Sequence, residues 1–134
     1  MNDLIRVAAM KLNRTDQAWS VQGLGTCLGG ANNGPHWVFA QVHATWRDVL
    51  YDIGQSLQRL NSSTNGWYDL ELQQHSSATE SVHVVYRFNG EAYQPARCFV
   101  LAYPFDNDGN VASTPTSRPC DWDWRKRVEP RQHK

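Results

Sequence analysis

The feature that most constrains the fold is a change of hydrophobic spacing in the middle of the chain. Within residues 45–60 the apolar side chains recur three and four positions apart, which places them on one face of a helix. Residues 67–73 and 82–88 instead alternate apolar with polar side chains, as half-buried strands do. The sequence therefore predicts a central amphipathic helix followed by two strands. The helical stripe consists of Trp46, Val49, Leu50, Ile53, Leu57 and Leu60.

Two glycines and a proline mark places where the backbone needs special geometry. Asn89-Gly90 is a hairpin dipeptide, so it returns the chain from residues 82–88 into another antiparallel strand. Pro95 has no N–H to donate and must therefore lie at a bulge or an edge. Gly54 costs about 1 kcal/mol relative to alanine inside a helix, so its presence indicates the close approach of another backbone.

The remaining segments complete an α+β prediction with one domain. The other expected elements are a short first helix at residues 4–12, a hairpin of residues 19–28 and 36–43, and a buried strand at residues 98–103. The predicted fold is a single domain over residues 1–111, in which an antiparallel sheet packs against the central helix. Residues 112–134 are rich in proline and basic side chains, and we expect an extended tail docked on the domain.

Charge and length exclude several classes of function. Thirteen basic and thirteen acidic residues cancel, which removes the basic field on which nucleic-acid binders rely. No apolar stretch reaches the length of a membrane-spanning helix, and the first residues do not have the pattern of a secretory signal. We expect a cytoplasmic protein that binds neither nucleic acid nor membrane.

The three cysteines give no recognisable framework. Cys27, Cys98 and Cys120 are odd in number and widely spaced, so neither a disulfide set nor a paired zinc motif follows from them. Cys98 lies inside an apolar run, where a cysteine behaves as a small hydrophobic side chain. A reducing compartment is the simpler expectation, and it agrees with a cytoplasmic location.

Two loops match ligand-binding motifs only in part. The glycine cluster at residues 23–29 departs from the dinucleotide-binding fingerprint at its last glycine and lacks the lysine of a P-loop. Residues 106–110 carry carboxylates and amides at the spacing of a calcium loop. Val111 stands where that loop needs glycine, however, and Ser117 stands where it needs glutamate. We therefore expect turns at both places and no cofactor.

Asp69 and Glu71 are the side chains that an enzyme would most plausibly use. They lie two positions apart on one strand and share a face, but acid–base chemistry needs a further partner on another strand. The histidines show no metal-ligand or nucleophile spacing, and they are His36, His43, His75, His83 and His133. The alternative function is thus a small hydrolase that uses Asp69 and Glu71, or a histidine, in a cleft between sheet and helix.

The same strand face favours protein binding. Trp67, Asp69, Glu71, His83 and Arg87 combine an aromatic anchor with charges that steer association. His83 and Arg87 are also expected as cross-strand partners of the two carboxylates, as on a solvated sheet face. We predict that these five residues bind a protein partner and that the chain is not an enzyme.

The order of the segments resembles one known family. The predicted helix at residues 46–60 is followed by Trp67-Tyr68-Asp69-Leu70-Glu71-Leu72 and then by residues 82–91, and this order resembles the YezG-like immunity proteins. These are small cytoplasmic proteins that neutralise bacterial toxins. The resemblance implies a protein that inhibits a toxin or an enzyme by direct binding. It covers only residues 46–91, and no site residue is carried over from it.

Overall fold

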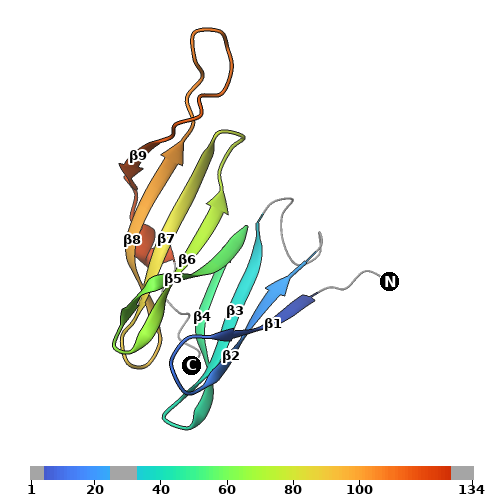
Figure 1. Cartoon of the computed structure of the whole chain (residues 1–134), viewed down its shortest axis with the longest axis vertical. Coiled ribbons are helices and arrows are strands. Elements are labelled where there is room, and N and C mark those ends of the chain that lie inside the picture. Colours follow the sequence, from blue (N-terminus) through green and yellow to red (C-terminus); the bar gives the residue numbers. More distant parts are fainter. Residues whose placement is uncertain (1–4, 25–32, 128–134) are drawn as a thin grey trace.

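The computed structural model describes residues 5–24 and 33–127 of the 134-residue chain, and these residues form mainly strands (Figure 1). The first antiparallel sheet holds, in this order, β1 (Ile5–Lys11), β2 (Gln17–Gly23), β3 (Gly34–Val42) and β4 (Thr45–Gly54). The second holds, in this order, β5 (Ser56–Thr64), β6 (Trp67–His75), β7 (Glu80–Phe88), β8 (Tyr93–Ala102) and β9 (Thr116–Pro119). A short helix, α1 (Trp124–Arg127), follows β9.

Tight turns build each sheet from neighbouring strands. His43 and Ala44 take φ values of 52° and 65° in the turn between β3 and β4. Asn65 and Gly66 take φ values of 54° and 80° between β5 and β6. Two-residue turns with positive φ match the right-handed twist of the strands that they join. Local pairing thus produces two meanders.

The chain passes from the first sheet to the second at Gly54. A Cβ added to Gly54 would lie 2.8 Å from the carbonyl oxygen of Gln73 and 2.8 Å from the side chain of Leu72, both on β6. Gln55 donates its N–H to the same carbonyl oxygen at 2.7 Å. The close backbone approach predicted at Gly54 is confirmed, and it holds the end of β4 against the second sheet.

The α+β prediction is wrong, because α1 is the longest helix among the described residues. The predicted central helix at residues 45–60 is replaced by β4 and β5. Val49 and Leu50 are buried, whereas Trp46 is 50% exposed and Ile53 is 44% exposed. Side chains that would share one helix face therefore lie on opposite sides of a strand.

A β-bulge accounts for the misleading spacing. The pairing of β3 with β4 shifts register, so that Val38 lies opposite Leu50 and Phe39 lies opposite Asp48. Val49 is the extra residue, and it is buried together with Leu50. The extra residue changes which positions of β4 face the core. As a result, the apolar residues of this strand are spaced as they would be in a helix, although no helix forms.

The predicted first helix at residues 4–12 is also wrong. Its described part is β1, which pairs with β2 from Ile5 to Lys11 without a register shift. Pairing with β2 gives the backbone N–H and C=O groups of β1 stable hydrogen bonds, whereas a helix this short would be only marginally stable. Leu12, directly after β1, is 1% exposed and belongs to the core.

Several strand predictions are confirmed. The two alternating segments are β6 and β7, and they pack on the first sheet instead of on a helix. The hairpin predicted near the start is the antiparallel pair β2 and β3, although residues 25–28 lie outside the described residues. A turn is present at Asn89-Gly90 as predicted, but it spans residues 89–92 instead of the two residues expected from the hairpin dipeptide. Gly90 has φ 103°, and Asn89 donates its N–H to the carbonyl of Ala92 at 2.9 Å. Pro95 lies at a register shift in β8, as expected.

Both sheets contribute to one apolar core. Val38, Ala40 and Leu50 come from the first sheet, and the second sheet contributes a larger set: Leu70, Leu72, Val82, Val84, Tyr86, Phe88, Tyr93, Cys98 and Val100. The segment between β8 and β9 extends away from the body (Figure 1). β9 then pairs with β8, and Trp124 of α1 packs against the core. Part of the predicted tail thus docks on the domain, while residues 128–134 lie outside the described residues.

A disulfide joins Cys98 of β8 to Cys120, directly after β9, across a sequence separation of 22. The spacing of the cysteines predicted no disulfide, because their pairing depends on which strands lie together. Cys98 is 6% exposed and Cys120 packs against the core. The bond therefore ties the segment that carries β9 and α1 to β8 of the second sheet.

A buried polar cluster joins the two sheets. The Tyr86 hydroxyl on β7 donates a hydrogen bond to a carboxylate oxygen of Asp52 on β4. The other carboxylate oxygen accepts the N–H of Ile53 at 2.7 Å. His36 lies opposite Asp52 in the β3–β4 pairing, and its Nε2–H donates to the Gly54 carbonyl at 3.0 Å. These side chains are less than a tenth exposed, so their hydrogen bonds replace water that folding removes.

We expect the stability of the protein to fall in weak acid because of His36. Burial lowers the pKa of His36 from its ordinary value of 6.5, against the opposing effects of the Gly54 carbonyl and Asp52. The unfolded chain therefore binds a proton at higher pH than the folded chain, and stability is lost as the pH drops below 6.5. His36→Gln should lose less stability than the wild type between pH 7.5 and pH 5, measured by urea denaturation. Parallel pH profiles of the two proteins would contradict this assignment.

The disulfide predicts a linked peptide and a measurable loss of stability. Proteolysis of the unreduced protein on the N-terminal side of aspartates should release two peptides, residues 69–105 and residues 108–120, that remain joined by the disulfide. A loop of this length corresponds to about 3 kcal/mol of stabilisation through the entropy of the unfolded chain. Replacing both Cys98 and Cys120 by alanine should lower the free energy of unfolding by that amount, with Cys27→Ala as the control. Recovery of the two peptides unlinked would refute the pairing.

Candidate functional site

The first sheet carries an unusual solvent-facing side. Its strands alternate, so that one side faces the core and the other faces water. On the water side, which we call the apolar face, most side chains are aliphatic or aromatic: Ile5, Val7, Trp19, Val21, Trp37, Phe39, Trp46, Tyr51 and Ile53. Lys11, Gln17, Gln41 and Asp48 are the polar side chains on this side. A sheet that packs on one side normally presents polar residues to water on the other. Exposed apolar surfaces that span a whole sheet mark interaction sites.

The register aligns the apolar face across all four strands. Val7 lies opposite Val21, Val21 opposite Trp37, and Trp37 opposite Tyr51. The rings of Trp37 and Tyr51 are in contact, with their centroids 5.3 Å apart. Val7 is 54% exposed and Tyr51 is 48% exposed, at opposite ends of this row. The row therefore forms a continuous apolar strip from β1 to β4.

One end of the strip is an open strand edge. Among the described residues β1 pairs only with β2, so its other side has no neighbouring strand. Its seven residues contain no proline and no bulge, and their charged side chains are Arg6 and Lys11. Native proteins usually protect such an edge by proline, bulges, charged side chains or a covering element, because unpaired backbone N–H and C=O groups readily pair with another chain.

The second sheet carries a chain of polar contacts, which we call the relay. Oε1 of Glu71 on β6 lies 2.7 Å from Nδ1 of His83 on β7. Nε2 of His83 lies 2.8 Å from the Ser81 hydroxyl, two residues earlier on the same side of β7. Gln58 of β5 donates to the second carboxylate oxygen of Glu71 at 3.1 Å. A serine, a histidine and a carboxylate are thus linked in series.

Aromatic and basic groups shield the relay. The His83 ring stacks on Phe99 of β8, with centroids 4.9 Å apart and planes 4° apart. The Arg97 guanidinium lies over Phe99 at 4.7 Å from the ring centroid. The side chains of His83 and Glu71 are only 11% and 13% exposed. Hydrogen bonds in such a shielded place are stronger than on an open surface.

The five predicted binding residues differ in their burial and in their contacts. Glu71 and His83 are brought together, as cross-strand partners were expected to be. Trp67 stacks on Phe88 with centroids 4.0 Å apart and packs against the core. Arg87 is exposed on β7. These residues therefore do not lie together on one open surface.

Asp69 is buried inside the second sheet and has a structural role. Its carboxylate accepts hydrogen bonds from the hydroxyls of Ser62 at 2.6 Å and Thr64 at 2.8 Å. Burial, with Asp69 nearby, raises the pKa of the Tyr93 hydroxyl, which donates to the Tyr68 carbonyl at 2.7 Å. Asp69 is 3% exposed and thus unavailable to a protein partner without rearrangement.

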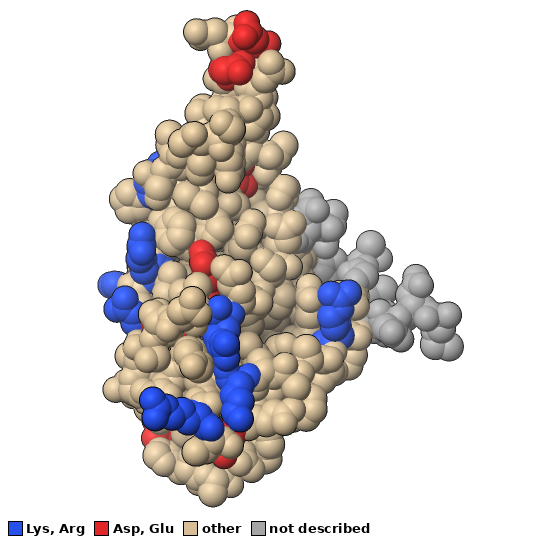
Figure 2. All heavy atoms as spheres, in the orientation of Figure 1, with Lys and Arg blue, Asp and Glu red and all other residues tan. Residues whose placement is uncertain are grey.

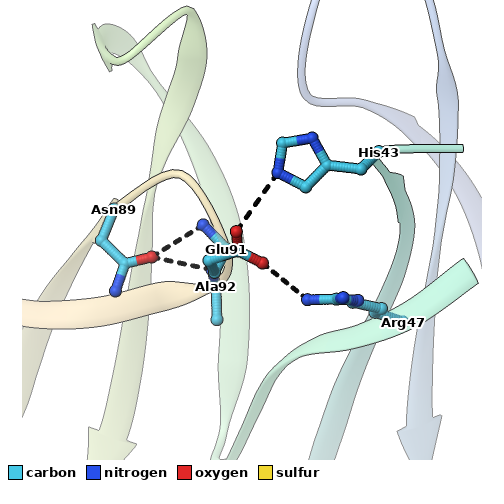
Figure 3. A network of polar contacts seen from close by, with 5 residues as sticks. All are labelled: His43, Arg47, Asn89, Glu91 and Ala92. Carbon is cyan, nitrogen blue, oxygen red and sulfur yellow. Dashed lines mark hydrogen bonds and ion pairs between the residues drawn. The ribbon is translucent and has the colours of Figure 1, made fainter. Parts of the chain in front are cut away.

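Glu91 connects the turns at one end of the two sheets. Its carboxylate accepts from Arg47 at 2.6 Å and lies 3.2 Å from Nε2 of His43 (Figure 3). Asn89 orients Glu91 by accepting its N–H and that of Ala92, at 2.8 and 2.9 Å (Figure 3). The side chains of His43, Arg47 and Glu91 are all about half exposed or more, so these contacts add little stability.

The partial calcium motif at residues 106–110 forms a turn. The Asp106 carboxylate accepts the N–H groups of Asp108 and Asn110, both at 2.9 Å, which is the pattern of a turn. No group of three or more potential metal-ligating side chains is found within residues 5–24 and 33–127. Most of the glycine cluster, together with Cys27 and His133, lies outside the described residues.

Comparison with known proteins gives no relative. No protein family, curated protein or solved structure matches the chain. The resemblance to YezG-like immunity proteins stays a prediction, and the helix at residues 46–60 that formed part of it is absent. In the part of the chain that the structure describes, no helix is long and apolar enough to cross a membrane.

Proposed function

We propose that the chain is a protein-binding module that receives an extended segment of a partner protein at β1. The observation that carries the proposal is the exposed strip from Val7 to Tyr51, which ends at an unpaired strand edge. An added strand would form main-chain hydrogen bonds with β1. Its alternate side chains would lie beside Ile5 and Val7 and extend the apolar face.

Aromatic side chains make this surface suitable for a protein partner. Trp19, Trp46 and Tyr51 are each between 41% and 50% exposed and lie on the apolar face. Tryptophan and tyrosine are enriched among the residues that dominate binding energy, because they bury a large rigid area. Strands of a sheet position them firmly, so little conformational entropy is lost on binding.

The charges near the edge favour an acidic partner segment. Arg6 and Lys11 lie on β1, Arg14 lies in the turn that follows, and none of the ion pairs found among the described residues involves them. Figure 2 shows basic side chains over the body of the molecule with some acidic ones among them, and a group of acidic side chains at the tip of the projecting segment. A partner that alternates apolar with acidic residues would match both the face and the charges.

The same charges argue against a second copy of this chain as the partner. Antiparallel pairing of two β1 strands would bring Arg6 and Lys11 of both copies to one seam. Repulsion among these four like charges opposes such a pairing. The hydrolase alternative has a separate basis in the second sheet, which does not involve β1.

The disulfide bears on where such binding takes place. Disulfides persist in oxidising compartments and are rare in the reducing cytosol. The Cys98–Cys120 bond therefore favours an oxidising compartment over the cytoplasmic location expected from the sequence. A partner met there would be an extracytoplasmic protein.

Selection of random displayed peptides on the immobilised wild-type protein tests the proposed function. We expect enriched peptides with alternating apolar and acidic residues. Val7→Glu should weaken their binding at least ~10-fold, because it places a carboxylate in the strip and repels acidic peptides. Phe105→Glu is the matched control, since Phe105 is 65% exposed on the projecting segment of the other sheet.

Two outcomes would count against this function. One is the absence of any enriched class of peptide on the wild-type protein. The other is equal affinity of the enriched peptides for the wild type and Val7→Glu. Dimerisation of the wild type that Val7→Glu abolishes would replace the proposed partner by a second copy of the chain.

A further inference from the structure

We propose that Ser81, His83 and Glu71 form an acyl-transfer site that hydrolyses small esters. The site lies on the outer side of the second sheet and is independent of the apolar face on the first. Its three members stand in the order of nucleophile, general base and orienting carboxylate. The two hydrogen-bond distances, 2.8 Å and 2.7 Å, are those of an assembled relay.

The contacts fix the tautomer that a general base requires. An ionised carboxylate only accepts hydrogen bonds, so the contact with Glu71 places the hydrogen of neutral His83 on Nδ1. Nε2 then carries the free electron pair and accepts the Ser81 hydroxyl hydrogen. Gln58 holds the second oxygen of Glu71 and thereby limits rotation of the carboxylate.

Packing holds the base in its productive orientation. His83 lies directly opposite Phe99 in the β7–β8 pairing, and the two rings stack nearly parallel. The hydroxyl of Ser81 approaches the ring from the same strand, two residues away. Side chains on paired central strands are positioned more precisely than those on loops, which favours reaction without a large rearrangement.

Side chains on β6 are available to stabilise the oxyanion. His75 lies directly opposite Ser81, and Gln73 lies directly opposite His83. Side chains opposite each other in an antiparallel pair have Cβ atoms about 5 Å apart. The backbone N–H groups of central strands are used within the sheet, so donors for an oxyanion must come from side chains such as these.

The reaction follows from these positions. Ser81 Oγ forms a bond to the ester carbonyl carbon while His83 Nε2 takes the hydroxyl proton. The tetrahedral intermediate then breaks its bond to the alcohol oxygen, which receives that proton from His83. Water attacks the acyl-serine and gives a proton to His83, and this proton returns to Ser81 as the carboxylic acid leaves. Leu101, opposite Ser81 on β8, offers an apolar contact for a small acyl group.

Labelling of the full chain with a fluorophosphonate probe tests the assignment. The probe forms a phosphorus–oxygen bond with an activated serine and releases fluoride, so the adduct can be mapped to Ser81 by mass spectrometry. Ser81→Ala should abolish labelling and lower hydrolysis of p-nitrophenyl acetate at least ~100-fold. Ser113→Ala, at an exposed serine outside the sheets, is the matched control and should behave as the wild type.

Glu71 is a positioning residue, and its variants separate catalysis from stability. Glu71→Gln should lower kcat at least ~10-fold with little change in KM and should alter the pH profile of hydrolysis, whereas Glu71→Asp should restore part of the rate. Thermal denaturation of each variant verifies that it is folded. Absence of label on folded wild-type protein, or equal labelling of Ser81→Ala, would overturn the proposal.

Discussion

The rest of the structure depends on the buried contact between Asp52 and Tyr86, because it joins the two sheets. A carboxylate that is 6% exposed needs hydrogen-bond donors, and it finds them in the Tyr86 hydroxyl and the Ile53 N–H. Leaving such a group unpaired costs about 1–3 kcal/mol. Two residues later Gly54 meets the backbone of β6. Together these contacts direct one side of the first sheet toward the core, which leaves the apolar face toward solvent.

Local patterns predicted the second sheet better than the first. Alternation identified β6 and β7, Asn89-Gly90 identified the turn after them, and Gly54 indicated a close backbone approach. The central helix was wrong because the bulge at Val49 placed apolar residues at helical spacing. Such a bulge depends on the pairing of β4 with β3, which spacing along one strand does not reveal. The disulfide between Cys98 and Cys120 likewise depends on the pairing of β8 with β9.

The candidate sites were predictable only in part. Strand alternation placed Glu71 and His83 on neighbouring strands, and the structure brings them into contact. Ser81 was missed because it precedes the alternating segment by one residue, although it shares the parity of His83. The apolar face was missed because assigning Trp46 and Ile53 to a helix placed them in the core. Their exposure follows only when β4 is recognised as a strand, whose outward-facing side chains reach solvent.

Nuclear magnetic resonance secondary chemical shifts of residues 45–60 test the central claim most directly, since both proposed surfaces require two sheets in place of a sheet and a helix. The structure predicts strand-type Cα and Cβ shifts on both sides of Gly54, with a break where the chain passes between the sheets. An uninterrupted run of helical shifts through these residues would contradict the fold. It would also remove the apolar face, because Trp46 and Ile53 would then lie on one helix face.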